Sequence, residues 1–362
     1  MSDIGRPLVE VDTPCLWVDV DILDRNLAYL AARFKKAGVQ WRPHSKGIKV
    51  PALAHKALRA GAIGVTCAKL SEAEVMASAG IMDILIANQI VSPNKTARLA
   101  QLCRSVDVKV AVDNAANVEA LGQAARAGGM EIGVLVEVNV GMERAGVLPG
   151  EPALTLARCV AQTPGLRFRG LMGWEGHMAT TEPLAARRPE IERAVQRLTD
   201  TAQLCRAAGL PVDIVSAGGS ATHAVTADLP GITEIQAGGG IFGDLYYQTA
   251  DTGTAPALFV QTQVTSHPAP ERLIFDAGFK SLPTWAGMPK AIGLNQVKDI
   301  SASAEHLTIT TISPIPEVKL GDHFNFIVGY GDATVFLHEA LYGVRDGRVE
   351  AVWPIAARGK LH

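Results

Sequence analysis

The 362-residue sequence has no surplus of charge, few aromatic residues and no long hydrophobic run. Its 34 lysines and arginines against 36 aspartates and glutamates give a net charge of −2, which excludes the basic surface that nucleic-acid binding requires. No apolar run reaches the ~20 residues of a membrane-spanning helix. The first residues lack the charged head and apolar core of a secretory signal. We therefore expect a cytoplasmic protein with neither a nucleic-acid nor a membrane partner.

Cysteines are also few: there are five, and none belongs to a CxxC pair. This argues against a disulfide scaffold and against a structural zinc site, and favours buried, reduced thiols. At 48% hydrophobic residues and low net charge, intrinsic disorder is excluded as well. The remaining composition is aliphatic and includes 35 glycines. It is typical of α/β proteins, in which Val and Ile fill buried strands and glycine occupies tight turns.

Short apolar segments alternate with helical patterns over the first two thirds of the chain. Eight of these segments have the character of strands: 39–43, 63–67, 83–87, 108–112, 132–138, 168–173, 212–216 and 233–237. The helical stretches between them include 51–60, 70–79, 115–127 and 190–208. Eight such units predict a (β/α)8 barrel of the TIM type, and an open doubly wound sheet is the structural alternative. In such barrels the chemistry lies at the carboxyl ends of the strands.

After about residue 250 the sequence has strand-like segments without comparable helices. These segments are 258–265, 272–276, 307–312, 323–328, 340–344 and 349–354. The last two form a hairpin pattern around Asp346-Gly347, and the β-like segment 9–20 could return to pair with this region. We therefore predict a barrel domain over 22–250 and a second, mostly antiparallel β domain formed by 1–21 and 251–362.

Candidate catalytic residues follow the predicted strands. Lys46 comes after the first strand, where burial can lower the pKa of a lysine and allow it to form a Schiff base, although a solvated loop lysine would have the same sequence. Glycine-rich turns at 217–222 and 237–240 follow the seventh and eighth strands. Glycine lets backbone N–H groups converge on a phosphate there, although such turns also occur without a ligand. Together the lysine and the turns indicate pyridoxal phosphate (PLP).

Six motifs spread over the whole chain extend this interpretation: 13–19 (TPCLWVD), 42–46 (RPHSK), 68–74 (AKLSEAE), 141–146 (GMERAG), 276–280 (DAGFK) and 352–359 (VWPIAARG). They resemble the D-threonine aldolase and D-serine dehydratase family, which are PLP enzymes related to alanine racemase. The resemblance implies a barrel with a β domain, and a homodimer with active sites near the subunit interface. It matches Lys46 to the PLP lysine and Arg144 to the arginine at the cofactor's phenolic oxygen. The phosphate-binding residues would be Gly219, Ser220, Ala221, Gly239 and Gly240.

The sequence departs from this family at the residues that assist the cofactor. The resemblance implies a divalent metal that polarises the substrate hydroxyl and is held by a His-x-Asp or His-x-Cys pair. Here Tyr330 precedes Asp332, and a phenol is a poor metal ligand because it must first lose a proton of pKa ~10. Thr180 stands where family aldolases have a histidine, and His177 lies about one helical turn earlier. Metal binding at Asp332 is therefore left open.

The leading hypothesis is a PLP-dependent carbon–carbon lyase for a small amino-acid substrate. It would cleave D-configured β-hydroxy-α-amino acids to glycine, or an analogue, and an aldehyde. Lys46 would hold the cofactor and carry a proton, His177 would be the base at the β-hydroxyl, and Asp332 would position a metal or the substrate. Tyr330 and His177 could instead be packing residues. The run 187–190 is interpreted as a solvated helix face.

Three alternatives remain open from the sequence. The first is a D-hydroxyamino-acid dehydratase that releases ammonia. The second is a metal-independent amino-acid racemase or epimerase, with Lys46 and Tyr330 acting as proton carriers on opposite faces of the substrate. The third is a non-catalytic PLP-binding protein, against which the additional β domain argues.

Overall fold

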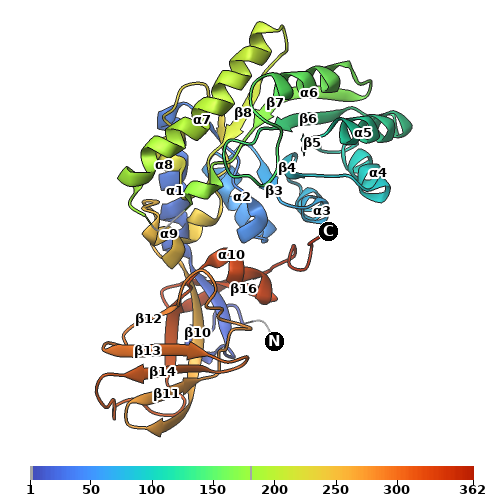
Figure 1. The fold of residues 1–362 in the computed structure, drawn as a ribbon. Coiled ribbons are helices and arrows are strands. Elements are labelled where there is room, and N and C mark those ends of the chain that lie inside the picture. The colour runs from blue at the N-terminus through green and yellow to red at the C-terminus, as the bar shows by residue number, and fades with distance from the viewer. Residues whose placement is uncertain (1–2, 180–181) are drawn as a thin grey trace.

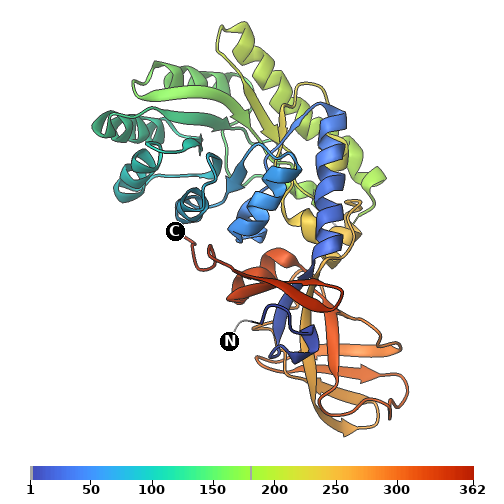
Figure 2. The ribbon, with the colours of Figure 1, turned by 180° about the vertical axis from the view of Figure 1, so that it is seen from behind.

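The computed structural model describes residues 3–179 and 182–362. A barrel of strands and helices stands above a second, largely antiparallel sheet (Figure 1). The N-terminal strand lies in the lower sheet, and the C-terminus lies beside the barrel near α3 (Figure 2). There, Ser71 N donates a hydrogen bond of 3.0 Å to the carbonyl oxygen of His362.

The barrel consists of eight strands in one curled parallel sheet, in the order β2-β9-β8-β7-β6-β5-β4-β3. Its two edges meet where His44, just after β2, forms a bridge with Thr66 of β3, whose N–H donates to Pro43 O at 2.9 Å. The (β/α)8 architecture predicted from the sequence is confirmed. The strands are β2 (Gln40–Trp41), β3 (Val65–Cys67), β4 (Asp83–Gln89), β5 (Asp107–Val112), β6 (Ile132–Glu137), β7 (Leu166–Met172), β8 (Ile214–Ala217) and β9 (Glu234–Ile235).

Helices cover the outside of this sheet, and local signals set several of their ends. The Asp19 carboxylate accepts a hydrogen bond of 2.8 Å from Ile22 N at the start of α1, and Gly38 ends that helix with φ 74°. The helix predicted over 190–208 instead begins at Leu184 and contains Pro189. The helices are α1 (Val20–Ala37), α2 (Pro51–Ala60), α3 (Leu70–Ser78), α4 (Pro93–Leu102), α5 (Ala115–Gly128), α6 (Glu151–Gln162), α7 (Leu184–Ala207), α8 (His223–Thr226) and α9 (Leu245–Thr249).

The second sheet runs β13-β14-β11-β10-β1-β16-β17, and β15 pairs with both β10 and β12. As predicted, the N-terminal segment returns to it, because β1 lies antiparallel to β10 and parallel to β16. The hairpin at Asp346-Gly347 is also present, and both residues have positive φ. The strands are β1 (Cys15–Asp19), β10 (Leu258–Ala269), β11 (Arg272–Phe275), β12 (Lys290–Ala291), β13 (Val297–Ala302), β14 (Leu307–Thr311), β15 (His323–Ile327), β16 (Ala340–Arg345) and β17 (Arg348–Pro354).

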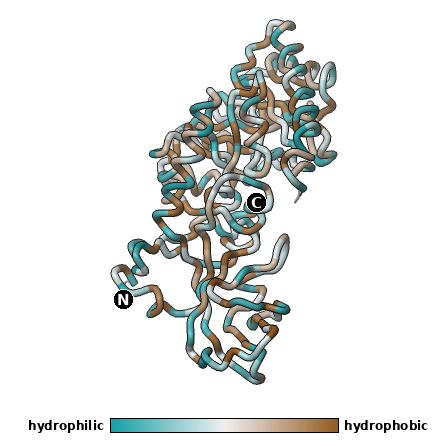
Figure 3. Tube along the Cα trace, turned by 90° about the vertical axis from the view of Figure 1, so that its left-hand side faces the viewer, coloured by the Kyte–Doolittle hydropathy of each residue, from teal (hydrophilic) through white to brown (hydrophobic). Residues whose placement is uncertain are grey.

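Hydrophobic and hydrophilic residues are interspersed along the lower sheet (Figure 3). In β14, Leu307, Ile309 and Thr311 are buried, while the residues between them are partly exposed. A sheet with one covered face has this period of two. Among the described residues, no helix is long and apolar enough to span a bilayer.

The lower sheet supplies one segment to the carboxyl end of the barrel. Tyr330 precedes the short helix α10 (Gly331–Thr334), whose first N–H donates to Asp244 Oδ2 at 2.6 Å. Asp244 also accepts from Tyr247 N at 3.0 Å and so caps α9 of the barrel. Burial raises the pKa of this carboxyl to about 8. The two parts of the chain are thereby joined at the place where barrel enzymes have their active sites.

Candidate active site

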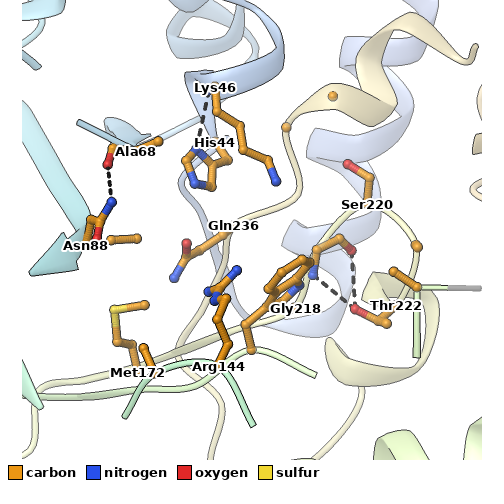
Figure 4. A pocket seen from close by; sticks show the side chains of 18 of the residues that line it. His44, Lys46, Ala68, Asn88, Arg144, Met172, Gly218, Ser220, Thr222 and Gln236 are labelled. Atoms are coloured by element: carbon orange, nitrogen blue, oxygen red, sulfur yellow. Dashed lines mark hydrogen bonds between the residues drawn. The ribbon is translucent and has the colours of Figure 1, made fainter. Parts of the chain in front are cut away.

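A cavity of about 370 Å³ opens at the carboxyl ends of the barrel strands. Figure 4 shows the Lys46 amine pointing into it between His44 and Ser220. Most of the lining residues follow barrel strands, as the barrel architecture predicts, and Tyr330 comes from the lower sheet. The polar lining residues include His44, Lys46, Asn88, Gln89, Glu137, Arg144, Ser220, Thr222, Gln236, Tyr246, Tyr247 and Tyr330.

Lys46 lies in a single 3-10 turn, Ser45–Gly47, just after β2. Its side chain is 39% exposed, and Nζ lies 3.6 Å from Asp332 Oδ2. Nζ also lies 5.2 Å from the centre of the Trp174 ring, within the range of a cation–π interaction. An amine in this position can reach a ligand in the cavity.

The buried Glu72 holds the turn that carries Lys46. The sequence analysis did not name Glu72 as a candidate site residue. Its side chain is 0% exposed, yet it lies in the first turn of α3. One carboxylate oxygen accepts a hydrogen bond of 2.8 Å from Ser45 Oγ and lies 3.9 Å from the buried ammonium of Lys49. The other accepts from Ala68 N at 2.8 Å. Both residues that pair with the first oxygen are close neighbours of Lys46, so Glu72 sets the position of the lysine turn.

The two glycine-rich turns meet beside Lys46. Gly240 N donates to Ser220 Oγ at 2.8 Å, which ties the turn after β9 to the turn after β8. A Cβ at Gly239 would lie 2.8 Å from both Asp332 Oδ1 and the Tyr247 hydroxyl, so only glycine fits there. Throughout residues 3–179 and 182–362, no group accepts a hydrogen bond from the backbone N–H of Ser220, Ala221 or Gly239.

These free donors suit a phosphate group, so the residues present fit PLP. Gly219, Ser220, Ala221 and Gly239, which the resemblance matched to phosphate-binding residues, line the cavity. Gly240 is not among the described lining residues, and its N–H is already donated to Ser220 Oγ. Its role in the turn is to orient the serine.

Two buried charged residues hold the glycine-rich turn at 217–222 in place. The sequence analysis did not identify either of them as part of the site. Arg187 is 2% exposed, which corrects the expectation of a solvated helix face. Its guanidinium donates to the carbonyl oxygens of Ala221 at 3.0 Å and Met178 at 2.7 Å, and also to those of Glu182 and Ala250. The buried Glu175 carboxylate accepts from Thr226 Oγ1 at 2.6 Å and from Gly218 N at 3.4 Å.

Arg144 lies in the loop after β6, above the Trp174 ring. Its Cζ is 5.0 Å from the ring centre, so Trp174 contacts both cations of the cavity, Arg144 and Lys46. The guanidinium nitrogen Nη2 of Arg144 lies 3.8 Å from Glu137 Oε1. Glu137 Oε2 accepts a hydrogen bond from Gln89 Nε2 at 2.6 Å. Burial raises the pKa of Glu137.

His177 is not placed beside Lys46. Within the described chain it is not among the residues that line the cavity. Its Nε2 lies 4.0 Å from Glu190 Oε1, and its buried Nδ1 has no hydrogen-bond partner among the described residues. A base for the substrate hydroxyl must come within hydrogen-bond reach of it. His177 as base therefore stays a prediction without geometric support, and Thr180 lies outside the described residues.

Tyr330 lines the cavity within a group of aromatic rings. The centres of the Tyr246, Tyr247 and Trp285 rings lie 4.7, 5.9 and 5.9 Å from that of Tyr330. Burial, and then the nearby Asp332 carboxylate, raise the pKa of Tyr330, so that its phenol keeps its proton at neutral pH. Asp332 lies at the same corner, and its buried Oδ1 has no hydrogen-bond partner in the described chain.

His223 directly follows the glycine-rich turn at 217–222. Its buried imidazole makes the free energy of unfolding depend on pH. His223 is 1% exposed, and burial, followed by the positive charge of Arg33, lowers its pKa from 6.5 to about 4. Between pH 6.5 and 4, His223 therefore binds a proton in the unfolded chain but stays neutral in the folded chain. The stabilisation is complete above pH 6.5 and is lost as the pH falls to 4, by about 3 kcal/mol.

We expect His223→Gln to flatten the dependence of unfolding free energy on pH between 6.5 and 4. Urea unfolding at a series of pH values would measure it. The exposed His306 provides the control, since His306→Gln is expected to leave the slope unchanged. Equal slopes for wild type and His223→Gln would contradict the assignment.

Comparison with known proteins agrees with this architecture. The family model of the alanine racemase N-terminal domain matches residues 18–246, and that of a putative serine dehydratase domain matches 257–344. The D-threonine aldolase of an Arthrobacter species is 38% identical over 98% of this chain and 95% of its own length. The 3-hydroxy-D-aspartate aldolase of Paracoccus denitrificans (strain Pd 1222) is 33% identical over 98% of this chain and 94% of its own.

Solved structures of related enzymes have the same fold. The crystal structure of D-threonine aldolase from Filomicrobium marinum matches with a TM-score of 0.96 and 35% identity over 100% of both chains. A variant of D-threo-3-hydroxyaspartate dehydratase, solved in a metal-free form, matches with a TM-score of 0.87 and 27% identity over 96% of this chain and 98% of that chain. The chain therefore belongs to the alanine racemase-like family that includes the D-threonine aldolases and 3-hydroxy-D-aspartate aldolases, as its motifs predicted.

Proposed function

We propose that this chain is a PLP-dependent lyase for D-configured β-hydroxy-α-amino acids, which it cleaves to glycine, or an analogue, and an aldehyde. The observation that carries the proposal is the position of Lys46, whose amine enters the same cavity as the free N–H groups of two glycine turns. Relatives that are 33% and 38% identical over nearly the whole chain are aldolases of this class, which supports the reaction type.

The chain's own residues have separate tasks in this proposal. When bound, PLP would withdraw electrons from the substrate's Cα. Lys46 Nζ would hold the cofactor covalently and carry a proton when released. The N–H groups of Ser220, Ala221 and Gly239 would bind its phosphate, and the Arg144 guanidinium would face its phenolic oxygen. Tyr330 would offer its retained proton to the substrate as a hydrogen-bond donor.

The test is a substrate panel with purified holoenzyme. D-Threonine, D-3-hydroxyaspartate and D-serine, with L-threonine as control, would be followed for glycine, aldehyde, oxo acid and ammonia. Glycine with an aldehyde from a D-substrate alone is the expected result. Ammonia with an oxo acid would identify a dehydratase instead, and solvent deuterium at Cα without bond cleavage would identify a racemase. The absence of every product would refute the proposal.

The proposal includes a cytoplasmic location and the division of the chain into 22–250 and 1–21 with 251–362. Support for the division comes from β1, which pairs with strands of the lower sheet only. The proposed break before residue 22 falls in the first turn of α1, just after β1 ends at Asp19.

We further propose that the chain forms a homodimer next to the cavity. The segment before β13 exposes four large apolar side chains, Phe279, Trp285, Met288 and Ile292. Trp285 is 70% exposed, and its ring contacts Tyr330, which lines the cavity. Neighbouring exposed apolar side chains of this kind mark interaction surfaces.

Trp285→Glu is therefore expected to convert a dimer to a monomer in sedimentation velocity, because it places a charge in the apolar contact. Ile312→Glu is the matched control, since Ile312 is 68% exposed but lies at the end of β14. It is expected to leave the dimer intact. A monomeric wild type, or a dimeric Trp285→Glu variant, would contradict the proposed interface.

A further inference from the structure

The surroundings of Asp332 do not suit the divalent metal that the family resemblance implied. Its Oδ1 packs against the backbone, because an added Cβ at Gly47 or Gly239 would lie 1.9 or 2.8 Å from that atom. Its Oδ2 faces the Lys46 amine at 3.6 Å. One oxygen is therefore enclosed by glycine backbone, and the other is already beside a cation.

The side chains around Asp332 also offer little to a metal. In the described parts of the chain, there is no group of three His, Cys, Asp or Glu side chains that could hold an ion. The neighbours of Asp332 in the cavity wall are the phenols of Tyr247 and Tyr330. The Asp244 carboxylate accepts from Gly331 N and Tyr247 N, so it is occupied. Mg²⁺ and Mn²⁺ require several oxygen or nitrogen ligands in a nearly fixed geometry.

We propose that this chain binds no divalent metal at Tyr330–Asp332, and that Asp332 is instead the counter-ion that positions Lys46. The carboxylate and the ammonium neutralise each other across 3.6 Å at the edge of the cavity. The glycines at 47 and 239 leave room for the carboxylate to approach the lysine turn this closely. Asp332 is thus a positioning residue for the lysine that the proposed function requires.

Mn²⁺ binding to the holoenzyme, measured by titration calorimetry and electron paramagnetic resonance, tests this proposal without substrate. Wild type is expected to show no stoichiometric Mn²⁺ site. One Mn²⁺ per chain that is lost in Asp332→Asn would overturn the proposal. Because the measurement needs no turnover, it stays separate from the substrate panel: an enzyme without lyase activity could still bind or exclude Mn²⁺.

Two variants at position 330 test whether the lack of a second ligand beside Asp332 contributes to the exclusion of the metal. Tyr330→His adds an imidazole two residues before Asp332 and is expected to raise Mn²⁺ affinity by at least about tenfold. Tyr330→Phe removes the hydroxyl without adding a ligand and is expected to bind no Mn²⁺. Circular dichroism would establish that both variants fold. A folded Tyr330→His that binds no more Mn²⁺ than Tyr330→Phe would overturn the inference that a phenol in place of an imidazole at position 330 excludes the metal.

Discussion

Lys46→Ala is expected to abolish the absorption band of the cofactor bonded covalently to the lysine and to reduce cleavage by roughly three orders of magnitude or more. The physical reason is that Lys46 carries the only lysine amine among the described residues that line the cavity. Alanine would remove the covalent bond and, with it, the charge beside Asp332. Absorption spectra after dialysis and product formation would measure both effects.

Lys46→Arg separates these two effects. Arginine keeps a positive charge near Asp332 and Trp174 but cannot form the covalent bond. It is expected to retain some cofactor non-covalently, without the absorption band of the covalent lysine adduct, and to remain inactive. Lys280→Ala is the control, because Lys280 is exposed, pairs with Glu305 and is not among the residues that line the cavity. A Lys46→Ala protein that stays coloured and active would exclude Lys46 as the cofactor lysine.

Glu72→Ala is expected to lower the free energy of unfolding by about 3–5 kcal/mol, the usual cost of breaking a buried ion pair. It would leave the Lys49 ammonium, which is 6% exposed, without a partner. It would also remove hydrogen bonds from Ser45 Oγ and Ala68 N. Since Ser45 and Lys49 flank Lys46, cofactor retention is expected to fall as well. Urea unfolding and the absorption band would report the two effects.

Glu74→Gln is the matched control on the same helix. Glu74 and Arg98 form a partly exposed pair, and such pairs contribute about 0–1 kcal/mol. The Glu74 variant is therefore expected to lose less than about 1 kcal/mol and to keep its cofactor. Similar losses for the two variants would show that Glu72 does not have the special role that its burial suggests.

Much of the fold could be predicted because its strands are buried runs of aliphatic residues. All six residues of β6 are buried, and its sequence carries the matching apolar signal. The Asp346-Gly347 pair likewise predicted a hairpin, since both residues adopt the positive φ that such turns require. The strand β13 was missed because none of its residues is buried, so it has no apolar pattern to detect.

The candidate site was predictable where a residue's place at a strand end decided its role. Lys46 and the glycine turns were found in this way, and the structure brings them to one cavity. Arg187 was misinterpreted because its sequence neighbours are charged, whereas its guanidinium is buried by donating to four carbonyl oxygens. Backbone carbonyls leave no mark in a side-chain pattern, so no sequence signal could have revealed these bonds.

The sequence by itself determined the alternation of strands and helices, the family and the positions of the lysine and the glycine turns. These features depend on local periodicity and on residues whose backbone freedom is local. Only the tertiary structure decided which polar side chains face the cavity. It placed Asp332 beside Lys46 and left His177 outside the lining. Burial and charge pairing arise from contacts between distant parts of the chain, and local sequence does not contain that information.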